Sequence, residues 1–317
     1  MLHTRRKTRA TGASREPGLF GYSTLTLIMG IPYRLLPGGM VFASQSQHNG
    51  SDVGIAFIRL LEANIMQIDL SGQSVLVTGG SRGIGAAIAR QLGSCGARVC
   101  VHYGTQKETA EALATTIAHD SFAIGADLAD SRACELLWEE VQERCGKIDA
   151  LVNNAGIAVE APLNQATPQW HAAWEKTMAV NLTATGLLCR SAIAHFQTKG
   201  GGRIVNIASR AAFRGDTPDY LAYAASKAGV VALTRSIARG FGKSDIKAFV
   251  LAPGFTRTEM ARAFIEKYGE DYAESDIALR RMTEPGDIAP TVAFLLSGLA
   301  DHATGSTIDL NAGSYVR

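Results

Sequence analysis

The chain has 317 residues, of which 46% are hydrophobic, enough for a large buried core and enough to exclude a protein that is disordered throughout. Its 31 basic and 29 acidic residues give a net charge of only +2, so the composition offers no basic surface for nucleic acid and favours a small-molecule partner. The five cysteines form no C-x-x-C pair and have no metal-ligand spacing to histidine, so we interpret them as reduced thiols in a reducing compartment and expect no metal site.

The N-terminal segment differs in composition from the rest of the chain. Residues 1–51 contain six basic side chains against one acidic one and are rich in Ser, Thr, Gly and Pro. This pattern is typical of an organelle transit peptide, but it also arises when a start codon is assigned too far upstream, which we favour. We therefore predict a disordered extension over residues 1–65 and one domain over residues 66–317. The protein is expected in the cytoplasm, or in a mitochondrion or other organelle if the extension is a transit peptide.

The apolar stretch of residues 19–31 does not predict a membrane anchor. It is shorter than the about 20 residues that span a bilayer, and Pro32 and Arg34 follow it. A signal peptide cleaved after Ala43 is a weaker alternative, because Gly, Ser and Thr dilute the apolar run. We expect no association with a membrane.

From residue 66 onward, short apolar or β-branched runs alternate with helical patterns. Strands are predicted at residues 74–78, 98–103, 121–127, 150–153, 202–207, 247–251 and 306–310. Helices are predicted at residues 84–92, 107–118, 132–144, 168–196, 223–241 and 287–296. Buried strands that alternate with helices need crossover connections, which give a parallel sheet. The sequence therefore predicts a doubly wound α/β domain, a Rossmann fold, with ligands beyond the carboxyl ends of the strands.

A glycine-rich turn joins the first predicted strand of this domain to its helix, with the spacing G-x-x-x-G-x-G. Gly79 permits the sharp turn, Gly83 lets a pyrophosphate approach the backbone, and Gly85 allows close packing of the helix on the strand. An ordinary tight loop is the alternative, but the position between a strand and a helix indicates a dinucleotide site. We assign to it Gly79, Ser81, Arg82, Gly83, Ile84 and Gly85.

The end of the second strand bears on which dinucleotide is bound. It reads Val-His-Tyr-Gly-Thr over residues 101–105 and lacks the acidic residue that would accept the ribose hydroxyls of NAD. Arg82 and Thr105 can instead hold a 2′-phosphate, so NADP(H) is favoured over NAD(H), and Tyr103 and Thr105 join the predicted cofactor site. Arg82 is alternatively a solvated surface residue, and we interpret His102 as a packed strand residue rather than a ligand.

The third and fourth strands end where the adenosine of a dinucleotide would lie. The Asp127 carboxylate can accept a hydrogen bond from the adenine amino group, and the small Ala155 and Gly156 would let the cofactor pass over the strand end. A helix N-cap at Asp127 and a polar turn at Asn153 are equally good structural explanations of these residues taken singly. We assign to the cofactor site Asp127, Leu128, Asn153, Ala155 and Gly156.

A Tyr-x-x-x-Lys pair near the fifth strand is the candidate proton-transfer group. Tyr223 and Lys227 are four residues apart on a predicted helix, so the ammonium can lie beside the phenol, and Ser209 ends the preceding strand. Shifting a phenol from a pKa near 10 to neutrality needs about 4 kcal/mol, the order of effect of one adjacent cation together with the positive nicotinamide. Tyr103 and Lys107 share this spacing, but no serine lies about fourteen residues upstream, so we interpret that pair as coincidence.

Taken in this order, the motifs over Met66–Arg317 resemble the short-chain dehydrogenase/reductase family of the compact type. The resemblance implies a catalytic set of Asn181, Ser209, Tyr223 and Lys227, in which the asparagine stabilises a helix kink and holds a water that leads to the lysine. It also implies that the nicotinamide carboxamide is contacted by Pro253, Gly254 and Thr258. Relatives are commonly homotetramers, so an oligomer is expected.

Three departures from the family pattern bear on the substrate and on subunit packing. They are Phe249, Arg210 directly after the catalytic serine, and Asn311 in the C-terminal segment Asn-Ala-Gly. The segment from Glu259 to Arg281 is expected to form a short lid over the substrate.

The chain most resembles the 3-oxoacyl-acyl-carrier-protein reductases, through TGGSRGIG, NNAG and PGFTRTEM. These motifs also occur in sugar, polyol and steroid dehydrogenases of the family. We expect an NADPH-dependent reduction of a ketone to a secondary alcohol, with an acyl thioester as the first substrate class and a sugar or polyol as the second. A dinucleotide-sensing regulatory protein is the non-enzyme alternative, which the intact acid–base set disfavours.

Overall fold

The computed structural model of the chain describes residues 33–35, 41–43, 68–269 and 275–316. Its contacts divide the chain into two units, Met1–Gln67 and Ile68–Arg317. In the first unit, β1 (Tyr33–Leu35) pairs antiparallel with β2 (Val41–Ala43). The predicted disorder of residues 1–65 otherwise falls on residues outside the described ones. The predicted domain over 66–317 stays a prediction, although its bounds differ from those of the second unit by two residues.

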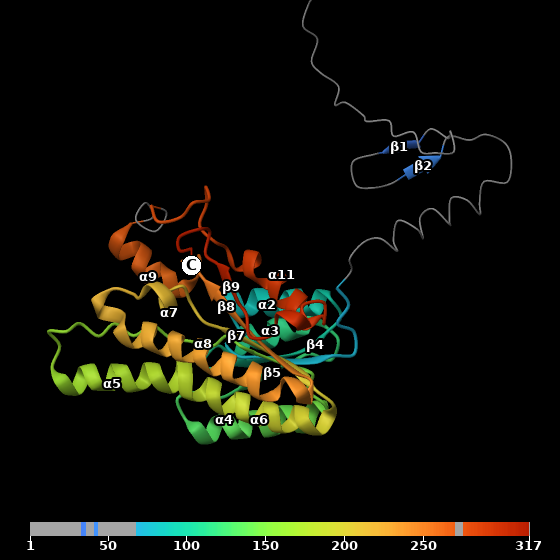
Figure 1. Cartoon of the computed structure of the whole chain (residues 1–317), viewed down its shortest axis with the longest axis horizontal. Helices are drawn as coiled ribbons and strands as arrows, with labels where there is room; N and C mark the ends of the chain where they lie inside the picture. The colour runs from blue at the N-terminus through green and yellow to red at the C-terminus, as the bar shows by residue number, and fades with distance from the viewer. Residues whose placement is uncertain (1–32, 36–40, 44–67, 270–274, 317) are drawn as a thin grey trace, which may run out of the picture. The chain divides into compact units, whose positions relative to one another are not determined.

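The second unit is built on one sheet of seven parallel strands (Figure 1). Their order is β5-β4-β3-β6-β7-β8-β9, so the chain runs outward from β3 and then returns to continue from β6 on the other side. The strands are β3 (Ser74–Val77), β4 (Arg98–Tyr103), β5 (Phe122–Gly125), β6 (Ala150–Asn153), β7 (Gly202–Ile207), β8 (Ile246–Pro253) and β9 (Thr307–Leu310). The predicted doubly wound parallel sheet is confirmed, and the strand order reverses between β3 and β6, where such sheets bind ligands.

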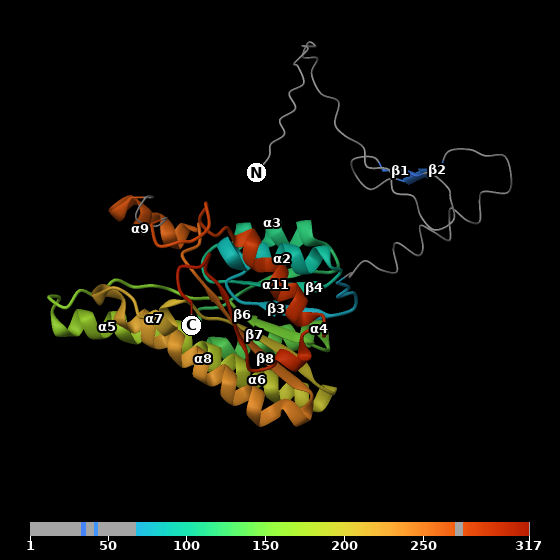
Figure 2. The ribbon, with the colours of Figure 1, turned by 45° about the horizontal axis from the view of Figure 1, so that its top comes forward.

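Helices cover both faces of the sheet (Figure 1, Figure 2). Alternate residues of each strand point to opposite faces, so Val75 and Val77 pack with one set of helices while Leu76 packs with the other. The first set is α2 (Gly83–Ser94), α3 (Lys107–Ile117) and α11 (Pro285–Leu296). The second set is α4 (Ser131–Cys145), α6 (Ala184–Lys199) and α8 (Leu221–Phe241). Because both faces are covered, the central strands are fully buried.

The helix predicted over residues 168–196 is divided in the structure. It consists of α5 (Thr167–Met178), the π-helical turn η1 (Ala179–Thr183) and α6. The hydrophobic period of residues 168–196 did not predict this π turn, which holds one extra residue, although the family resemblance implied a helix kink stabilised by Asn181. Asn181 lies in this turn.

Shorter elements connect the main ones. The 3₁₀ turn η2 (Pro218–Tyr220) leads into α8, and α7 (Ala211–Arg214) follows β7. After β8, the side chain of Thr258 accepts a hydrogen bond from the amide of Ala261 and so caps α9 (Glu259–Tyr268). The predicted lid over 259–281 therefore begins with a helix.

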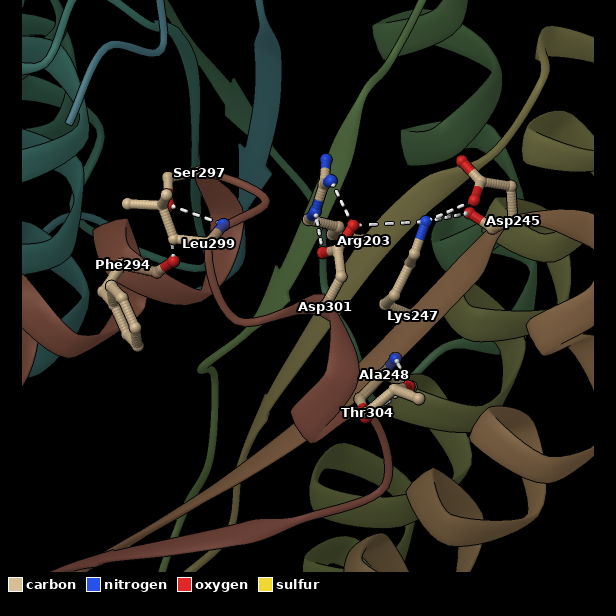
Figure 3. Close-up of polar contacts among 9 residues, drawn as sticks. All are labelled: Arg203, Asp245, Lys247, Ala248, Phe294, Ser297, Leu299, Asp301 and Thr304. Carbon is tan, nitrogen blue, oxygen red and sulfur yellow. Dashed lines mark hydrogen bonds and ion pairs between the residues drawn. The ribbon is translucent and has the colours of Figure 1, made fainter.

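An ion-pair cluster joins the starts of β7 and β8 to the 3₁₀ turn η4 (Asp301–Ala303) (Figure 3). The guanidinium of Arg203 donates two hydrogen bonds of 2.8 Å to the Asp301 carboxylate. Lys247 lies 3.3 Å from Asp301 and also pairs with Asp245. The hydrogen bonds from Arg203 lower the pKa of Asp301. This cluster lies at the amino ends of the strands, opposite the edge at which a ligand is expected.

None of the helices in the described residues is long and apolar enough to cross a membrane.

Candidate active site

Lys227 is buried in α8 at the carboxyl edge of the sheet. Its side chain is 4% exposed, and Nζ donates a hydrogen bond of 2.9 Å to the carbonyl oxygen of Ile207, the last residue of β7. A Cβ atom at Gly156 would lie 3.2 Å from Nζ, so the absence of a side chain there leaves room for the ammonium. Burial lowers the pKa of Lys227 to about 8. The structure therefore holds a cation with one protein acceptor at the end of β7.

Tyr223 lies one helical turn before the lysine, and its ring centroid is 5.8 Å from Nζ of Lys227. Its phenol hydrogen-bonds with the side chain of Ser209, whose Oγ also accepts from the amide of Ala211 at 3.1 Å. Burial raises the pKa of Tyr223, the bond with Ser209 lowers it, and the charge of Asp216 raises it, with burial the largest effect. The lowered phenol pKa predicted from the sequence depends on the positive nicotinamide of a bound dinucleotide as well as on Lys227, and it stays a prediction.

Asn181 is 1% exposed, and its amide group bonds to two other segments. Oδ1 accepts from the backbone N–H of Ile157 at 2.8 Å, and Nδ2 donates to the Ile157 carbonyl at 2.9 Å and to Ser226 Oγ at 3.0 Å. The π turn thus connects the loop after β6 to α8 next to the lysine. A Cβ at Gly156 would also lie 3.4 Å from Asn181 Oδ1, so Asn181, Gly156 and Lys227 are neighbours.

The glycine-rich turn has the sharp turn predicted at Gly79 and the close packing predicted at Gly85, whereas the approach of a pyrophosphate to Gly83 stays a prediction. Gly79 and Gly83 have φ angles of +61° and +53°, a region that favours glycine. A Cβ at Gly85 would overlap the carbonyl oxygen of Gly79, so only a glycine allows this approach of α2 to the end of β3. A Cβ at Gly83 would lie 3.3 Å from Cγ2 of Thr258, so the turn adjoins the segment predicted to contact nicotinamide.

Asn154 also holds this turn, although the sequence analysis did not assign it. Its Nδ2 donates to the carbonyl oxygens of Thr78 and Gly79 at 2.9 and 3.1 Å. Thr78 Oγ1 accepts in return from the amides of Asn154 and Ala155 at 3.0 and 3.1 Å. The sequence feature that could have indicated this role is the position of Asn154 directly after β6, a strand that neighbours β3.

His102 is the second residue that the sequence analysis did not assign to the site. It is buried, and Nδ1 accepts a hydrogen bond of 3.0 Å from the amide of Gly79, which leaves the ring proton on Nε2, 3.1 Å from the carbonyl oxygen of Ala126. Burial lowers its pKa to about 4, so the ring is neutral at pH 7. One side chain on β4 thus connects the glycine-rich turn to the end of β5, just before Asp127.

The remaining predicted cofactor residues lie along the same edge of the sheet in different environments. Thr105 and Asp127 are exposed, Tyr103 is half-buried, and the Asp127 carboxylate accepts from the amide of Ala129 at 2.9 Å. Leu128 is buried. The side chain of Asn153 lies inside the domain, where Nδ2 donates to Asn206 Oδ1 at 2.8 Å, so only its backbone faces the site edge.

The end of β8 lies beside Ser209. The carbonyl oxygen of Pro253 accepts from the amide of Arg210 at 2.9 Å, and the amide of Gly254 donates to Leu310 at 2.9 Å. Close packing of Gly254 on Asn311, at 2.7 Å from a built Cβ to Cα, leaves no room for a side chain there.

Arg82, predicted to bind a phosphate, pairs with Glu259 of α9 in this structure. Both side chains are about half exposed, at 55% and 50%. Arg82 is the N-cap residue of α2 and directly follows Ser81 in the glycine-rich turn. Its present partner is therefore the first residue of the predicted lid.

A parallel sheet with a glycine-rich turn at its switch point and a Ser–Tyr–Lys set at the same edge defines the class of nicotinamide-dinucleotide oxidoreductases. A family profile described as Enoyl-(Acyl carrier protein) reductase matches residues 79–314. The 3-oxoacyl-(acyl-carrier-protein) reductase of Staphylococcus aureus is 38% identical over 247 residues, which cover 77% of this chain and 98% of that protein.

Solved structures of short-chain dehydrogenases and reductases are also similar to this chain. A short-chain dehydrogenase from Burkholderia cenocepacia in complex with NADP is 34% identical, with a TM-score of 0.70 over 77% of this chain and 98% of the other. The 3-ketoacyl-(acyl-carrier-protein) reductase of Brucella melitensis, complexed with NADH, is 28% identical, with a TM-score of 0.71 over 78% of this chain and all of the other. The chain belongs to the short-chain dehydrogenase/reductase family and is an NAD(P)-dependent oxidoreductase.

Proposed function

We propose that the protein is an NADP(H)-dependent reductase that converts the ketone of a 3-oxoacyl thioester into a secondary alcohol. The observation that carries the proposal is the buried Lys227 ammonium beside Tyr223, whose phenol bonds to Ser209, at the edge of the sheet that also holds the glycine-rich turn. The similarity to 3-oxoacyl-(acyl-carrier-protein) reductases supports the thioester as the substrate class.

In the proposed mechanism, the chemistry that a bound reduced nicotinamide would supply is a hydride for the carbonyl carbon. Tyr223 donates its phenolic proton to the carbonyl oxygen as negative charge develops there, and Ser209 donates a hydrogen bond to the same oxygen. Because the resulting phenolate lies near Lys227, the ammonium stabilises it electrostatically. The proton then returns to Tyr223 from the lysine side, where Asn181 holds the loop and α8 together.

The cofactor is held, in this proposal, by the residues predicted from the sequence. The residues Gly79, Ser81, Arg82, Gly83, Ile84 and Gly85 would surround the pyrophosphate at the N-terminus of α2. The strand ends with Tyr103, Thr105, Asp127, Leu128, Asn153, Ala155 and Gly156 would hold the adenosine half. The segment with Pro253, Gly254 and Thr258 would hold the nicotinamide half.

The preference for NADP(H) rests on Arg82. Its guanidinium is half exposed beside the turn, and residues 103–105 carry no carboxylate that would repel a 2′-phosphate. We propose that Arg82 exchanges its bond to Glu259 for a bond to this phosphate.

Turnover by the full-length chain tests the proposal, with NADPH and NADH followed by absorbance. The panel holds an acetoacetyl thioester, a simple β-keto ester, a sugar and a polyol. Preferential oxidation of NADPH by the thioester is the expected result. If the chain turns over only NAD(H), and only with sugars or polyols, the proposed NADP(H) preference and the proposed thioester substrate are both wrong. Dinucleotide binding without turnover of any substrate would favour a regulatory protein.

The homotetramer and the cytoplasmic location expected from the resemblance belong to this proposal as well. Light scattering on the purified chain measures the first, and fractionation of cells measures the second. We assign the activity to the domain over residues 66–317 and none of it to residues 1–65, which a comparison of the full chain with Met66–Arg317 measures.

A further inference from the structure

Two cysteine thiols lie in contact outside the candidate active site. Sγ of Cys100, in β4, is 3.4 Å from Sγ of Cys145, the last residue of α4. Cys100 is buried, whereas Cys145 is partly exposed and so within reach of a small solute. All five cysteines lie in the described part of the chain, and this is the one pair among them whose thiols touch.

The other three cysteines have different surroundings. Cys134 donates to the carbonyl oxygen of Leu128, Cys189 is fully buried beside the Asn153 and Asn206 amides, and Cys95 lies next to the Gln91 amide. Burial raises the pKa of Cys134 to about 11 and that of Cys189 to about 12. These two thiols stay protonated and unreactive at neutral pH.

Two arginines lie near Cys145: Arg144 directly precedes it in α4, and Arg98 lies on β4 with Cys100. The guanidinium carbons of Arg144 and Arg98 lie 3.5 and 5.4 Å from the ring centroid of Phe122, which pairs with Cys100 across the sheet. The contact with Cys100 has the largest effect on the pKa of Cys145 and lowers it to about 7. Arg98, Ser74 and Arg144 also lower this pKa, and burial raises it. The same contact raises the pKa of Cys100. Because Cys145 is the more exposed of the two residues and Cys100 is buried, the negative charge of a thiolate is favoured on Cys145.

We propose that Cys145 and Cys100 form a redox site that closes a reversible disulfide within the chain. A peroxide is the oxidant. The Cys145 thiolate attacks one peroxide oxygen and becomes a sulfenic acid, and the other oxygen leaves as hydroxide. The Cys100 sulfur loses its proton and attacks the sulfenic sulfur of Cys145, which forms the S–S bond and expels the sulfenic oxygen as hydroxide. Each of the two hydroxides takes up a proton and becomes water. Two thiols are oxidised, and one hydrogen peroxide is reduced to two waters.

The geometry favours this second step over a reaction between two chains. The sulfurs need to approach by about 1.4 Å to reach a bond of about 2.05 Å, and Cys145 lies at the end of a helix, where small movements cost least. Cys100 is buried, so a sulfur of another molecule does not reach it. A dithiol reductant reverses the reaction by thiol–disulfide exchange.

Free-thiol counting after denaturation, with peptide mapping under non-reducing conditions, tests the proposal on the full-length chain. Hydrogen peroxide at pH 7 is expected to lower the count from five to three, to join the peptides of Cys100 and Cys145, and to be reversed by dithiothreitol. Initial oxidation should accelerate as the pH rises through 7, because the thiolate reacts. Because this peptide mapping uses the wild-type chain, its outcome does not depend on whether a cysteine variant folds.

Matched variants separate the two steps. Cys100→Ser should leave a sulfenic acid at Cys145 that dimedone traps, Cys145→Ser should leave Cys100 reduced, and Cys134→Ser should form the linked peptide like the wild type. A link between two chains, first modification of Cys95, or a sulfenic acid on Cys145 that persists in the wild type would overturn the proposal.

Discussion

The amide of Gly79 donates a hydrogen bond of 3.0 Å to Nδ1 of His102, a residue 23 positions later in the chain. The opposite ring nitrogen faces the carbonyl oxygen of Ala126 at 3.1 Å. One neutral imidazole therefore fixes the start of the glycine-rich turn relative to the end of β5. In the candidate site these two strand ends would hold the pyrophosphate and the adenine.

Replacing His102 should weaken dinucleotide binding without changing the chemical step. His102→Phe removes both bonds, and the loss of a buried hydrogen bond predicts about a tenfold higher dissociation constant for the dinucleotide. His102→Asn keeps an acceptor near the position of Nδ1 and should lose less. Fluorescence titration measures the affinity, and kcat should stay within about twofold.

His195 offers the matched control. It is also buried, and its Nε2 accepts from the amide of Ile148 at 3.0 Å, ahead of the start of β6. His195→Asn should lower stability and leave the dinucleotide affinity unchanged. Equal losses of affinity in the two variants would show that His102 has no specific role in the site.

His102 also predicts a pH dependence of stability. Its pKa is about 4 in the folded chain against about 6.5 when unfolded, so between these values the unfolded state binds more protons. Stability should thus be complete above pH 6.5 and fall as the pH drops toward 4, by about 3 kcal/mol at most from this residue. Urea unfolding at pH 7 and pH 4.5 measures the difference, which should shrink in His102→Asn. An unchanged difference would mean that other groups govern it.

Tyr223→Phe should remove the proton donor and keep the fold. The expected fall in kcat is about 100-fold to 10,000-fold, because general acid catalysis contributes on that order. Dinucleotide affinity should be nearly unchanged, since the ring remains. Steady-state kinetics and the same titration measure both values, and wild-type turnover in this variant would exclude the mechanism proposed for Tyr223.

The ion pair of Arg82 with Glu259 predicts that substitutions of these two residues change NADPH affinity in opposite directions. Arg82→Ala should weaken NADPH binding about tenfold or more and leave NADH binding unchanged, because a charge-assisted bond to phosphate is lost. Glu259→Gln should strengthen NADPH binding, since the competing carboxylate is neutralised. Arg132→Ala is the control, because Arg132 is an exposed arginine that pairs within α4. Equal weakening of NADPH and NADH by Arg82→Ala would contradict the proposed phosphate contact.

The cluster around Asp301 should affect stability and not activity (Figure 3). Its pKa is lowered by Arg203, so the carboxylate stabilises the fold above its unfolded pKa of about 4 and loses this contribution as the pH falls through the folded value. Asp301→Asn at pH 7 should destabilise the chain by about 2 kcal/mol, because it weakens two charge-assisted hydrogen bonds. Urea unfolding measures the loss, and a larger fall in kcat than in stability would argue against a purely structural role.

Within the domain, most of the fold could be predicted because it is encoded locally. Each strand is a short apolar run and each helix a longer periodic one, so their alternation in the sequence is enough to predict a parallel sheet. The glycine-rich turn and the Tyr-x-x-x-Lys pair are also local, since their spacing is set by a single turn and a single helix. The family resemblance implied a helix kink at Asn181, but the helical period did not predict the π turn, in which Asn181 bonds to the distant backbone of Ile157.

By itself, the sequence determined the class of fold, the position of the dinucleotide turn and the candidates for proton transfer. The tertiary structure alone decided which partners these residues have. It placed His102 against Gly79, Asn154 against Thr78, Arg82 against Glu259 and Cys145 against Cys100. It also set the burial that raises the pKa of Tyr223, because the free energy of a charge depends on its surroundings. Such contacts join segments far apart in the chain, and they form only when the sheet brings the ends of its strands together.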